Sequence, residues 1–175
     1  MFSDPKKNIG QMFIGEGMKV ADFGAGVGFY TFALAEKVGE YGRVFALDVM
    51  GDHLVKIKKE AERKGIKHID IVHADLEVLK GSGLPDASVD RVLITDVLFQ
   101  VDHPGHVAAE AKRILKRTGK VVVIEWVESF NMIGPHPDHV MSEKETVAAF
   151  TELGFKVEDK FDAGSHHYGI LFKLA

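Results

Sequence analysis

The sequence predicts a doubly wound α/β fold, with a mostly parallel seven-stranded sheet and an antiparallel C-terminal strand. Short apolar runs alternate with amphipathic stretches over the first 126 residues, and a glycine-rich turn follows the first run. In the last third, this alternation of apolar runs and amphipathic stretches changes, and the sequence ends in two adjacent strand-like runs. With 175 residues of ordinary composition, we expect a single domain over residues 1–175.

Five apolar runs are predicted to be parallel strands. They are rich in Val, Ile, Leu or Phe and show little in-and-out alternation, as expected when helices cover both faces of a sheet. The runs are residues 18–23, 43–48, 69–73, 89–95 and 120–126.

Amphipathic stretches between these runs predict helices at residues 30–38, 52–64 and 105–116. A further helix is expected over residues 142–153, because Ser142 and Glu145 have the spacing of a capping box and Gly154 can end the helix. Residues 155–161 and 168–174, around a turn at 162–165, are typical of an antiparallel hairpin added to the parallel sheet.

Charge and residue usage exclude several classes of function. Subtracting 26 acidic from 22 basic residues gives a net charge of -4, which argues against nucleic acid as a partner. The absence of cysteine excludes thiol nucleophiles and thiolate metal sites. We see no signal-peptide run and no apolar stretch of ~18 residues, so we expect a cytoplasmic protein without a membrane partner. The sequence leaves open whether the chain forms a homo-oligomer or binds a partner subunit.

The glycine-rich turn is the most informative stretch. The first apolar run ends near Asp22, and Gly24, Gly26 and Gly28 precede the first helix. Glycines let the backbone approach a ligand closely, and the helix N-terminus offers N–H groups to an anion. Nicotinamide dinucleotide folds require G-x-G-x-x-G, but Phe29 stands where the third glycine should fall. The spacing therefore disfavours a nicotinamide cofactor.

Acidic residues end or follow four consecutive predicted strands. Asp48 ends the second run, where a carboxylate can accept hydrogen bonds from both hydroxyls of a ribose. Asp75 follows the third run and can accept from an adenine amino group or cap a turn. Asp96 follows the fourth run and can meet a cationic group. Together with Asp22, these residues predict one ligand site at the carboxyl edge of the sheet.

The motifs resemble the class I S-adenosylmethionine-dependent methyltransferases, whose fold is Rossmann-like. Residues 22–28 look like the nucleotide-binding loop of this family, and Asp48 looks like its ribose acid. Residues 114–120 look like the family's turn before the fifth strand, but Arg117 and Thr118 differ from the residues that are usual in this motif. The resemblance covers about residues 17–126 and is closest to the small-molecule enzymes of quinone biosynthesis and arsenite methylation. Without cysteine, thiolate-dependent arsenite methylation is excluded.

The resemblance implies S-adenosyl-L-methionine as the cofactor and a role for each matching residue. The three glycines would pack against the methionine and ribose, and Asp48 would hold the ribose hydroxyls. Other implied cofactor contacts are Asp22 at the amino group, Val49 and Met50 beside the adenine, Asp75 and the Leu76 amide at its edge, and Asp96 and Val97 at the methionine end.

On the acceptor side, the resemblance implies in-line displacement of the methyl group, which requires no covalent residue. If a base is needed, the candidates are histidines 103, 136, 139, 166 and 167, and we single out His103 because it follows the Asp96 strand. A capping or solvated role is the alternative for His103. Phe99, His136 and Tyr168 are the candidate substrate contacts, and the histidine spacing gives no reason to expect a metal.

The N-terminal segment, residues 1–17, has two interpretations. Phe2, Met12 and Phe13 can form a small lid over the site, or they can pack a helix onto the core, which we favour. The function predicted overall is methyl transfer to a small-molecule substrate. The alternatives are a nicotinamide-dependent reductase, which NADH binding would reveal, and a non-catalytic cofactor-binding subunit, which turnover by the isolated chain would exclude.

Overall fold

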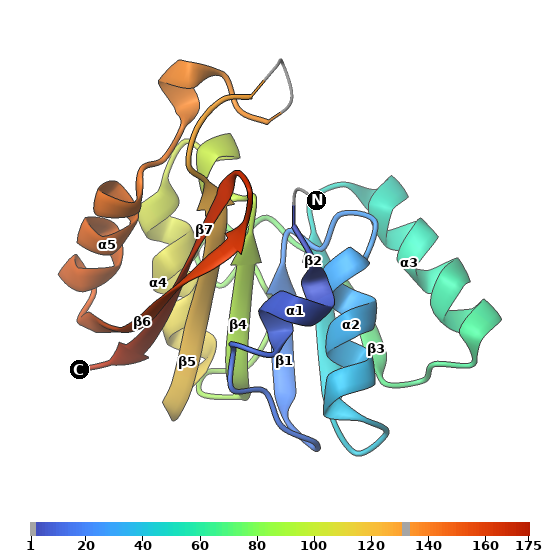
Figure 1. The fold of residues 1–175 in the computed structure, drawn as a ribbon. Helices are drawn as coiled ribbons and strands as arrows, with labels where there is room; N and C mark the ends of the chain where they lie inside the picture. The colour runs from blue at the N-terminus through green and yellow to red at the C-terminus, as the bar shows by residue number, and fades with distance from the viewer. Residues whose placement is uncertain (1–2, 131–133) are drawn as a thin grey trace.

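The computed structural model describes residues 3–130 and 134–175 and confirms the predicted fold class (Figure 1). Seven strands form one sheet in the order β3-β2-β1-β4-β5-β7-β6, in which β7 runs antiparallel to both of its neighbours. The strands are β1 (Lys19–Phe23), β2 (Arg43–Asp48), β3 (Ile69–His73), β4 (Val89–Thr95), β5 (Leu115–Trp126), β6 (Phe155–Gly164) and β7 (His167–Leu174).

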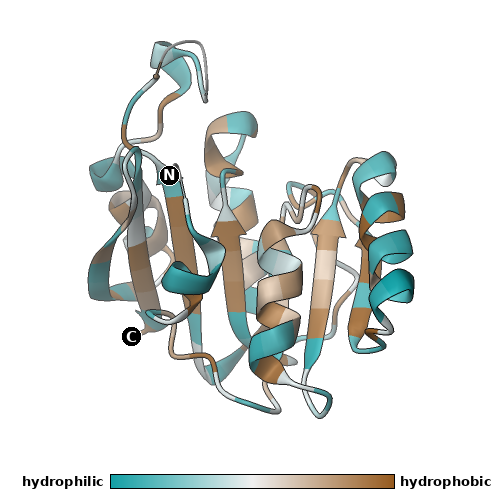
Figure 2. Ribbon diagram, turned by 45° about the vertical axis from the view of Figure 1, so that its right-hand side comes forward, coloured by the Kyte–Doolittle hydropathy of each residue, from teal (hydrophilic) through white to brown (hydrophobic). Residues whose placement is uncertain are grey.

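Helices cover both faces of the sheet. One face carries α1 (Pro5–Ile9), α2 (Phe29–Val38) and α3 (Gly51–Lys64), and the other carries α4 (Pro104–Ile114) and α5 (Glu143–Glu152). Two short 3-10 turns, η1 (Leu98–Gln100) and η2 (Pro137–His139), follow β4 and β5 along the chain. Figure 2 shows the apolar strands between helices whose outer surfaces are polar. This arrangement explains why the strand sequences are continuously apolar.

Two predicted boundaries are wrong, for local reasons. The helix expected to reach residue 116 ends at Ile114, and β5 begins at Leu115, which pairs with Val89. Of the residues expected to form a turn at 114–120, Ile114 ends α4 and the others belong to β5, and the register shift between Val89 and Arg91 takes up the extra length. The hairpin turn lies after Gly164 rather than at 162–165, because β6 contains two register shifts.

The capping box predicted for α5 is confirmed. The Ser142 hydroxyl accepts from the Glu145 amide at 3.3 Å, and the Glu145 carboxylate accepts from the Ser142 amide at 2.8 Å. The last helical residue is Glu152, and Gly154 follows the cap residue Leu153 with φ +84°.

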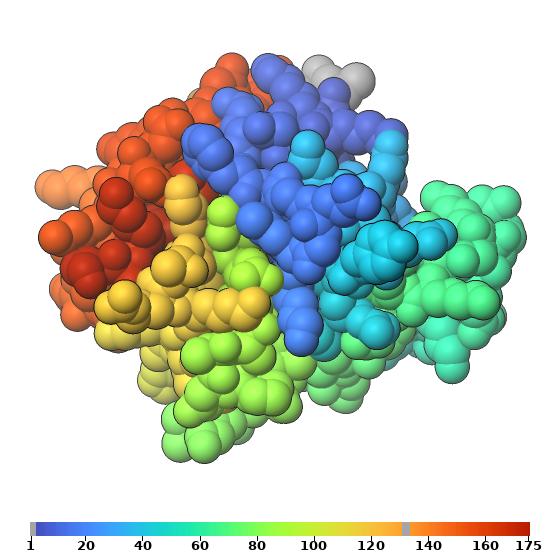
Figure 3. All heavy atoms as spheres, turned by 90° about the horizontal axis from the view of Figure 1, so that it is seen from below, coloured from blue at the N-terminus to red at the C-terminus, as the bar shows by residue number. Residues whose placement is uncertain are grey.

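The N-terminal segment crosses the sheet toward its amino edge. Met12 is fully buried beside α2, and its carbonyl accepts from the guanidinium of Arg91 at 3.2 Å. Seen from below in Figure 3, this blue segment lies across the lower end of the molecule beside α2. Phe13 is 59% exposed, and Phe2 lies outside the described residues.

Candidate cofactor and acceptor site

The predicted acids gather at the carboxyl edge because β3, β2, β1 and β4 are adjacent and parallel. The glycine loop lies between β1 and α2, and Gly24, Gly26 and Gly28 all have left-handed backbones, with φ +71°, +53° and +93°. A Cβ on Gly24 would overlap Val97, so the loop packs directly on the segment after β4. A Cβ on Gly26 would meet only a carbonyl oxygen at 3.9 Å. The Gly26 backbone is therefore open to a ligand.

Asp48 is fixed between two loops at the end of β2. Its carboxylate accepts from the Gly26 amide and the Met50 amide, each at 2.7 Å, and His53 Nδ1 lies 3.4 Å away. Each carboxylate oxygen has lone-pair capacity left for a further donor. Val49 and Met50 beside it are 61% and 53% exposed. A fixed carboxylate with exposed apolar neighbours fits a ribose diol carrying a flat base.

Asp22 anchors the glycine loop to the next helix. Its side chain is 1% exposed and accepts a 2.6 Å hydrogen bond from the Thr31 hydroxyl on α2. Burial, reinforced by the nearby charge of Asp48, raises the pKa of Asp22 to about 7, although the Thr31 hydrogen bond acts in the opposite direction. Its contact with the amino group of the cofactor stays a prediction.

Asp75 caps a turn, which was the alternative role predicted for this residue. Its carboxylate accepts from the Glu77 amide at 3.0 Å, and its side chain is exposed at the edge of the sheet. The neighbouring Leu76 is buried. The adenine contacts of both residues stay predictions, and the turn orients the Asp75 carboxylate without using both of its oxygens.

Beyond Asp96, a buried acid shapes the loop after β4. The Glu125 carboxylate accepts from the Val97 amide at 2.8 Å and the Leu98 amide at 2.6 Å. Burial, with the neighbouring charge of Asp96, raises the pKa of Glu125 to about 8. The sequence interpretation missed this residue. Its signal was an acid at the end of an otherwise apolar run, at residues 121–124.

A groove of about 660 Å³ lies beside this loop, between η1 and the segment 134–141. Phe99 and His136, both predicted as substrate contacts, line the groove together. Its other walls are mixed: Leu98, Val101 and Met141 are apolar. The polar lining residues are Gln100, Asp102, His139 and Glu145. The structure thus brings two of the three predicted substrate residues to one concave surface next to Asp96.

Tyr168 and His103, the other two predicted residues of the acceptor side, do not line the groove. The Tyr168 hydroxyl donates to the Met141 carbonyl at 2.8 Å and lies 2.7 Å from the Thr146 hydroxyl, so it supports the groove wall from the core. His103 is exposed at the start of α4, where its amide donates to Glu77 at 2.6 Å, and it is not among the groove residues. Their roles toward a substrate stay predictions.

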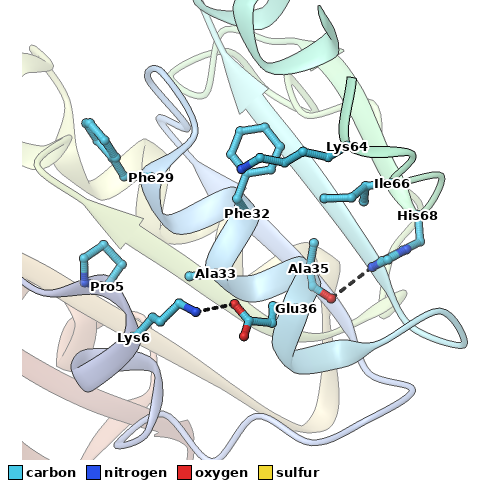
Figure 4. A pocket seen from close by; sticks show the side chains of 10 residues that line it. All are labelled: Pro5, Lys6, Phe29, Phe32, Ala33, Ala35, Glu36, Lys64, Ile66 and His68. Carbon is cyan, nitrogen blue, oxygen red and sulfur yellow. Dashed lines mark hydrogen bonds and ion pairs between the residues drawn. The ribbon is translucent and has the colours of Figure 1, made fainter. Parts of the chain in front are cut away.

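A second hollow, of about 560 Å³, lies on the outer face of α2 (Figure 4). Its polar side chains are engaged with one another: Lys6 pairs with Glu36 at 2.6 Å, and Lys64 lies over the Phe32 ring at 4.6 Å. None of the predicted site residues lines it. The groove at the carboxyl edge is therefore the better candidate for chemistry. Within residues 3–130 and 134–175, no helix is long and apolar enough to cross a membrane.

The glycine loop and the fixed acid at the end of β2 define a nucleotide-binding α/β protein. Residues 14–169 match a family model described as a methyltransferase domain, so the chain belongs to this family. The fold and loop are those of class I S-adenosylmethionine-dependent methyltransferases, as the sequence predicted. S-adenosyl-L-methionine is the cofactor of this class, and the open Gly26 backbone and the fixed Asp48 carboxylate fit it.

Curated relatives and solved structures agree with this assignment. A demethylmenaquinone methyltransferase from Bacillus cereus (strain ATCC 10987 / NRS 248) is 30% identical over 148 residues, which are 85% of this chain and 61% of that protein. Another, from Anoxybacillus flavithermus (strain DSM 21510 / WK1), is 32% identical over 120 residues, 69% of this chain and 49% of that protein. The chain thus spans about half to three fifths of the length of these relatives.

The structure of a SAM-dependent methyltransferase from Aquifex aeolicus matches with a TM-score of 0.90 and 27% identity, covering 99% of this chain and 91% of that one. An arsenic(III) S-adenosylmethionine methyltransferase from Chlamydomonas reinhardtii shares the fold, with a TM-score of 0.72 and 20% identity, over 95% of this chain and 69% of that one.

Proposed function

We propose that this chain transfers a methyl group from S-adenosyl-L-methionine to a small molecule with an aromatic ring, bound in the groove beside Asp96. The proposal rests on the carboxylate of Asp48, which two backbone amides hold at the end of β2. Leu98, Phe99 and Met141 in the groove wall can pack on a ring, and the demethylmenaquinone methyltransferases among the relatives act on a quinone precursor by name.

In the proposed complex, Asp48 binds the ribose hydroxyls, and Val49 and Met50 flank the adenine. The glycine loop follows the methionine and ribose, with Asp22 behind it and with Asp75, Leu76 and Val97 at its borders. The cofactor supplies an activated methyl group. The chain contributes binding, alignment and exclusion of water, and holding the reacting atoms at about 3 to 3.5 Å can supply several kcal/mol of the barrier reduction.

Calorimetric titration with S-adenosylhomocysteine tests the cofactor half of the proposal. We expect saturable binding by the wild-type chain. Asp48→Ala should lower the affinity by about 10- to 150-fold, because a hydrogen bond to a charged group contributes about 1.5–3 kcal/mol. No binding at millimolar ligand would exclude the proposed cofactor.

Asp70→Ala is the matched control. Asp70 pairs with Arg43 at 3.2 Å, away from the carboxyl edge, and both side chains are nearly half exposed. This variant removes an acid from the same pair of strands but leaves the site intact, so its affinity should equal that of the wild type. An equal loss in both variants would move the ribose away from Asp48.

A further inference from the structure

Several buried polar atoms at the carboxyl ends of β4 and β5 and at the amino end of β7 have no hydrogen-bond partner among residues 3–130 and 134–175. They are Thr95 Oγ1, Asp96 Oδ1, Glu125 Oε2 and both ring nitrogens of His167. Native proteins pair nearly all of their buried polar atoms, so each exception requires an explanation. Among the described residues, five of the six such atoms gather beside the groove, and the sixth, Asn8 Oδ1, lies in α1. The cluster indicates a place for a polar ligand group.

Asp96 and His167 form the centre of this group. His167 Nε2 lies 3.2 Å from Asp96 Oδ1, within ion-pair distance, although the angle between them is not that of a hydrogen bond. The His167 side chain is 2% exposed, whereas that of Asp96 is 37% exposed. Because Oδ1 itself is buried, the exposure belongs to the rest of the Asp96 side chain. The His167 ring thus lies against one oxygen and leaves the other side of the carboxyl group accessible.

The backbone presents Asp96 under strain. Its φ is +55°, a left-handed conformation that residues other than glycine rarely adopt. Strained residues persist where the surrounding structure fixes them, and they cluster at functional sites. Here the Gln100 side chain donates to the Asp96 carbonyl, and Glu125 holds the next two amides. The turn therefore fixes the direction of the Asp96 side chain.

Contacts connect this pair to the groove. The Trp126 ring packs on the His167 ring, with centroids 4.3 Å apart. A Cβ on Gly134, which lines the groove, would overlap the same Trp126 ring. On the other side, Leu98 and Phe99 continue directly from the Asp96 turn into the groove wall. Asp96 therefore lies where the cofactor edge and the groove meet.

The charges around the pair favour a hydrogen-bond donor as the ligand group. Burial, with a smaller contribution from the charge of Asp96, raises the pKa of Glu125 on β5 and of Tyr30 on α2. Within the described residues, no three His, Cys, Asp or Glu side chains are grouped to hold a metal ion. A carboxylate only accepts hydrogen bonds, so it selects a group with an O–H or N–H.

We propose, building on the function proposed above, that Asp96 binds a hydroxyl group of the aromatic acceptor and that His167 is the positioning residue that holds Asp96 for this contact. The acceptor class is then a hydroxylated aromatic molecule, with its ring in the groove and its hydroxyl at Asp96. This assignment moves Asp96 from the cofactor, where the sequence placed it, to the acceptor.

Binding of two matched probes tests the assignment. In saturating S-adenosylhomocysteine, 1-naphthol and 1-methoxynaphthalene are titrated by calorimetry into the full chain. We expect the wild type to prefer 1-naphthol by at least tenfold, because a site built for a hydroxyl rejects the analogue without it. Asp96→Asn should reduce the preference below about threefold and leave the affinity for S-adenosylhomocysteine unchanged. Asparagine also tolerates the left-handed backbone, so the turn is preserved.

His167 is tested by two variants. His167→Phe should lose the preference like Asp96→Asn, whereas His167→Gln, which keeps an N–H donor, should retain part of it. His68→Gln is the control, since His68 lies 2.9 Å from the Ala35 carbonyl on another part of the sheet. Unchanged S-adenosylhomocysteine binding shows in each variant that the site is folded.

Three results would overturn the inference. The first is a wild type that binds S-adenosylhomocysteine but does not distinguish the two probes, which would leave the cofactor proposal intact. The second is a tenfold loss of S-adenosylhomocysteine affinity in Asp96→Asn, which would return Asp96 to the cofactor. The third is loss of the preference in His103→Gln instead of Asp96→Asn. A wild type without S-adenosylhomocysteine binding would refute the proposed function and this inference together.

Discussion

Two buried carboxyl groups, Asp22 and Glu125, support the loops that carry the site. Each is 1% exposed, and burial raises the pKa to about 7 for Asp22 and about 8 for Glu125. Each nevertheless receives donors, the Thr31 hydroxyl in one case and two backbone amides in the other. These hydrogen bonds tie the end of β1 to α2 and the loop after β4 to β5.

The raised pKa of Asp22 predicts a pH-dependent stability. Its ordinary value is 3.8, so the folded chain binds more protons than the unfolded chain between about pH 4 and pH 7. The stability from the protonated form is fully present below about pH 4 and is lost as the pH rises through about 7. Asp22→Asn removes this dependence, so the variant should gain on the order of 4 kcal/mol relative to wild type between pH 4 and pH 8, since one pKa unit corresponds to about 1.4 kcal/mol.

Urea unfolding of both chains at pH 4, 6 and 8 measures this gain. All other titrating groups are shared, so the difference between the two chains isolates Asp22. Asp70→Asn, in a partly exposed pair with Arg43, is the control and should show no comparable gain. A difference between Asp22→Asn and wild type that stays constant with pH would contradict the raised pKa.

At the scale of one residue, the sequence predicted the position of Asp48 at the end of a strand but not the partners of Asp96. Asp48 could be predicted because it directly ends a strand that is recognisable by its own composition. Glu125 meets Asp96 because β4 pairs with β5, and His167 meets it because β5 pairs with β7, which places Trp126 opposite His167. This register is nonlocal and is set by packing, so a histidine could be suspected there but not assigned to a carboxylate.

At the scale of elements, the ranges of the strands were predicted better than the boundaries and turns that connect them to their neighbours. The ranges of β2, β3 and β4 match the prediction because apolar cover on both sides leaves a continuous pattern. Leu115 is apolar and fits either a helix face or a strand, so the boundary between α4 and β5 depended on its pairing with Val89. The hairpin turn lies at a different place than predicted, because β6 contains register shifts and these have no clear sequence signal.

The capping box of α5 predicts a measurable change at the level of this element. Ser142→Ala removes the hydroxyl that accepts from the Glu145 amide and should cost about 1 kcal/mol in urea unfolding. Met141 and Glu145 also line the groove, so affinity for 1-naphthol should fall by a few-fold. Ser142→Asp keeps an acceptor at the cap and should behave like wild type. Equal stability of Ser142→Ala and wild type would show that packing of Phe150 alone holds the helix.

At the scale of the whole molecule, the contacts that anchor the N-terminal segment and the candidate binding site lie at opposite edges of the sheet. The N-terminal segment is tied to the amino edge by the Arg91 guanidinium, which donates to the carbonyls of Met12 and Phe13. The glycine loop, Asp48, Asp96 and the groove lie at the opposite edge of the same sheet. A ligand at the carboxyl edge therefore contacts loops from several strands at once and should stabilise the fold as a unit.

This separation predicts a thermal shift that distinguishes the cofactor classes. A ligand at 100 times its Kd stabilises the folded chain by about 2.7 kcal/mol. In a chain of this size, that should raise Tm by about 5–10 °C. S-adenosylhomocysteine should produce this shift in the wild type, and Asp48→Ala should show a smaller shift at the same concentration. NADH should produce none, since Phe29 replaces the glycine that its binding loop requires. A shift with NADH and none with S-adenosylhomocysteine would instead support the reductase alternative.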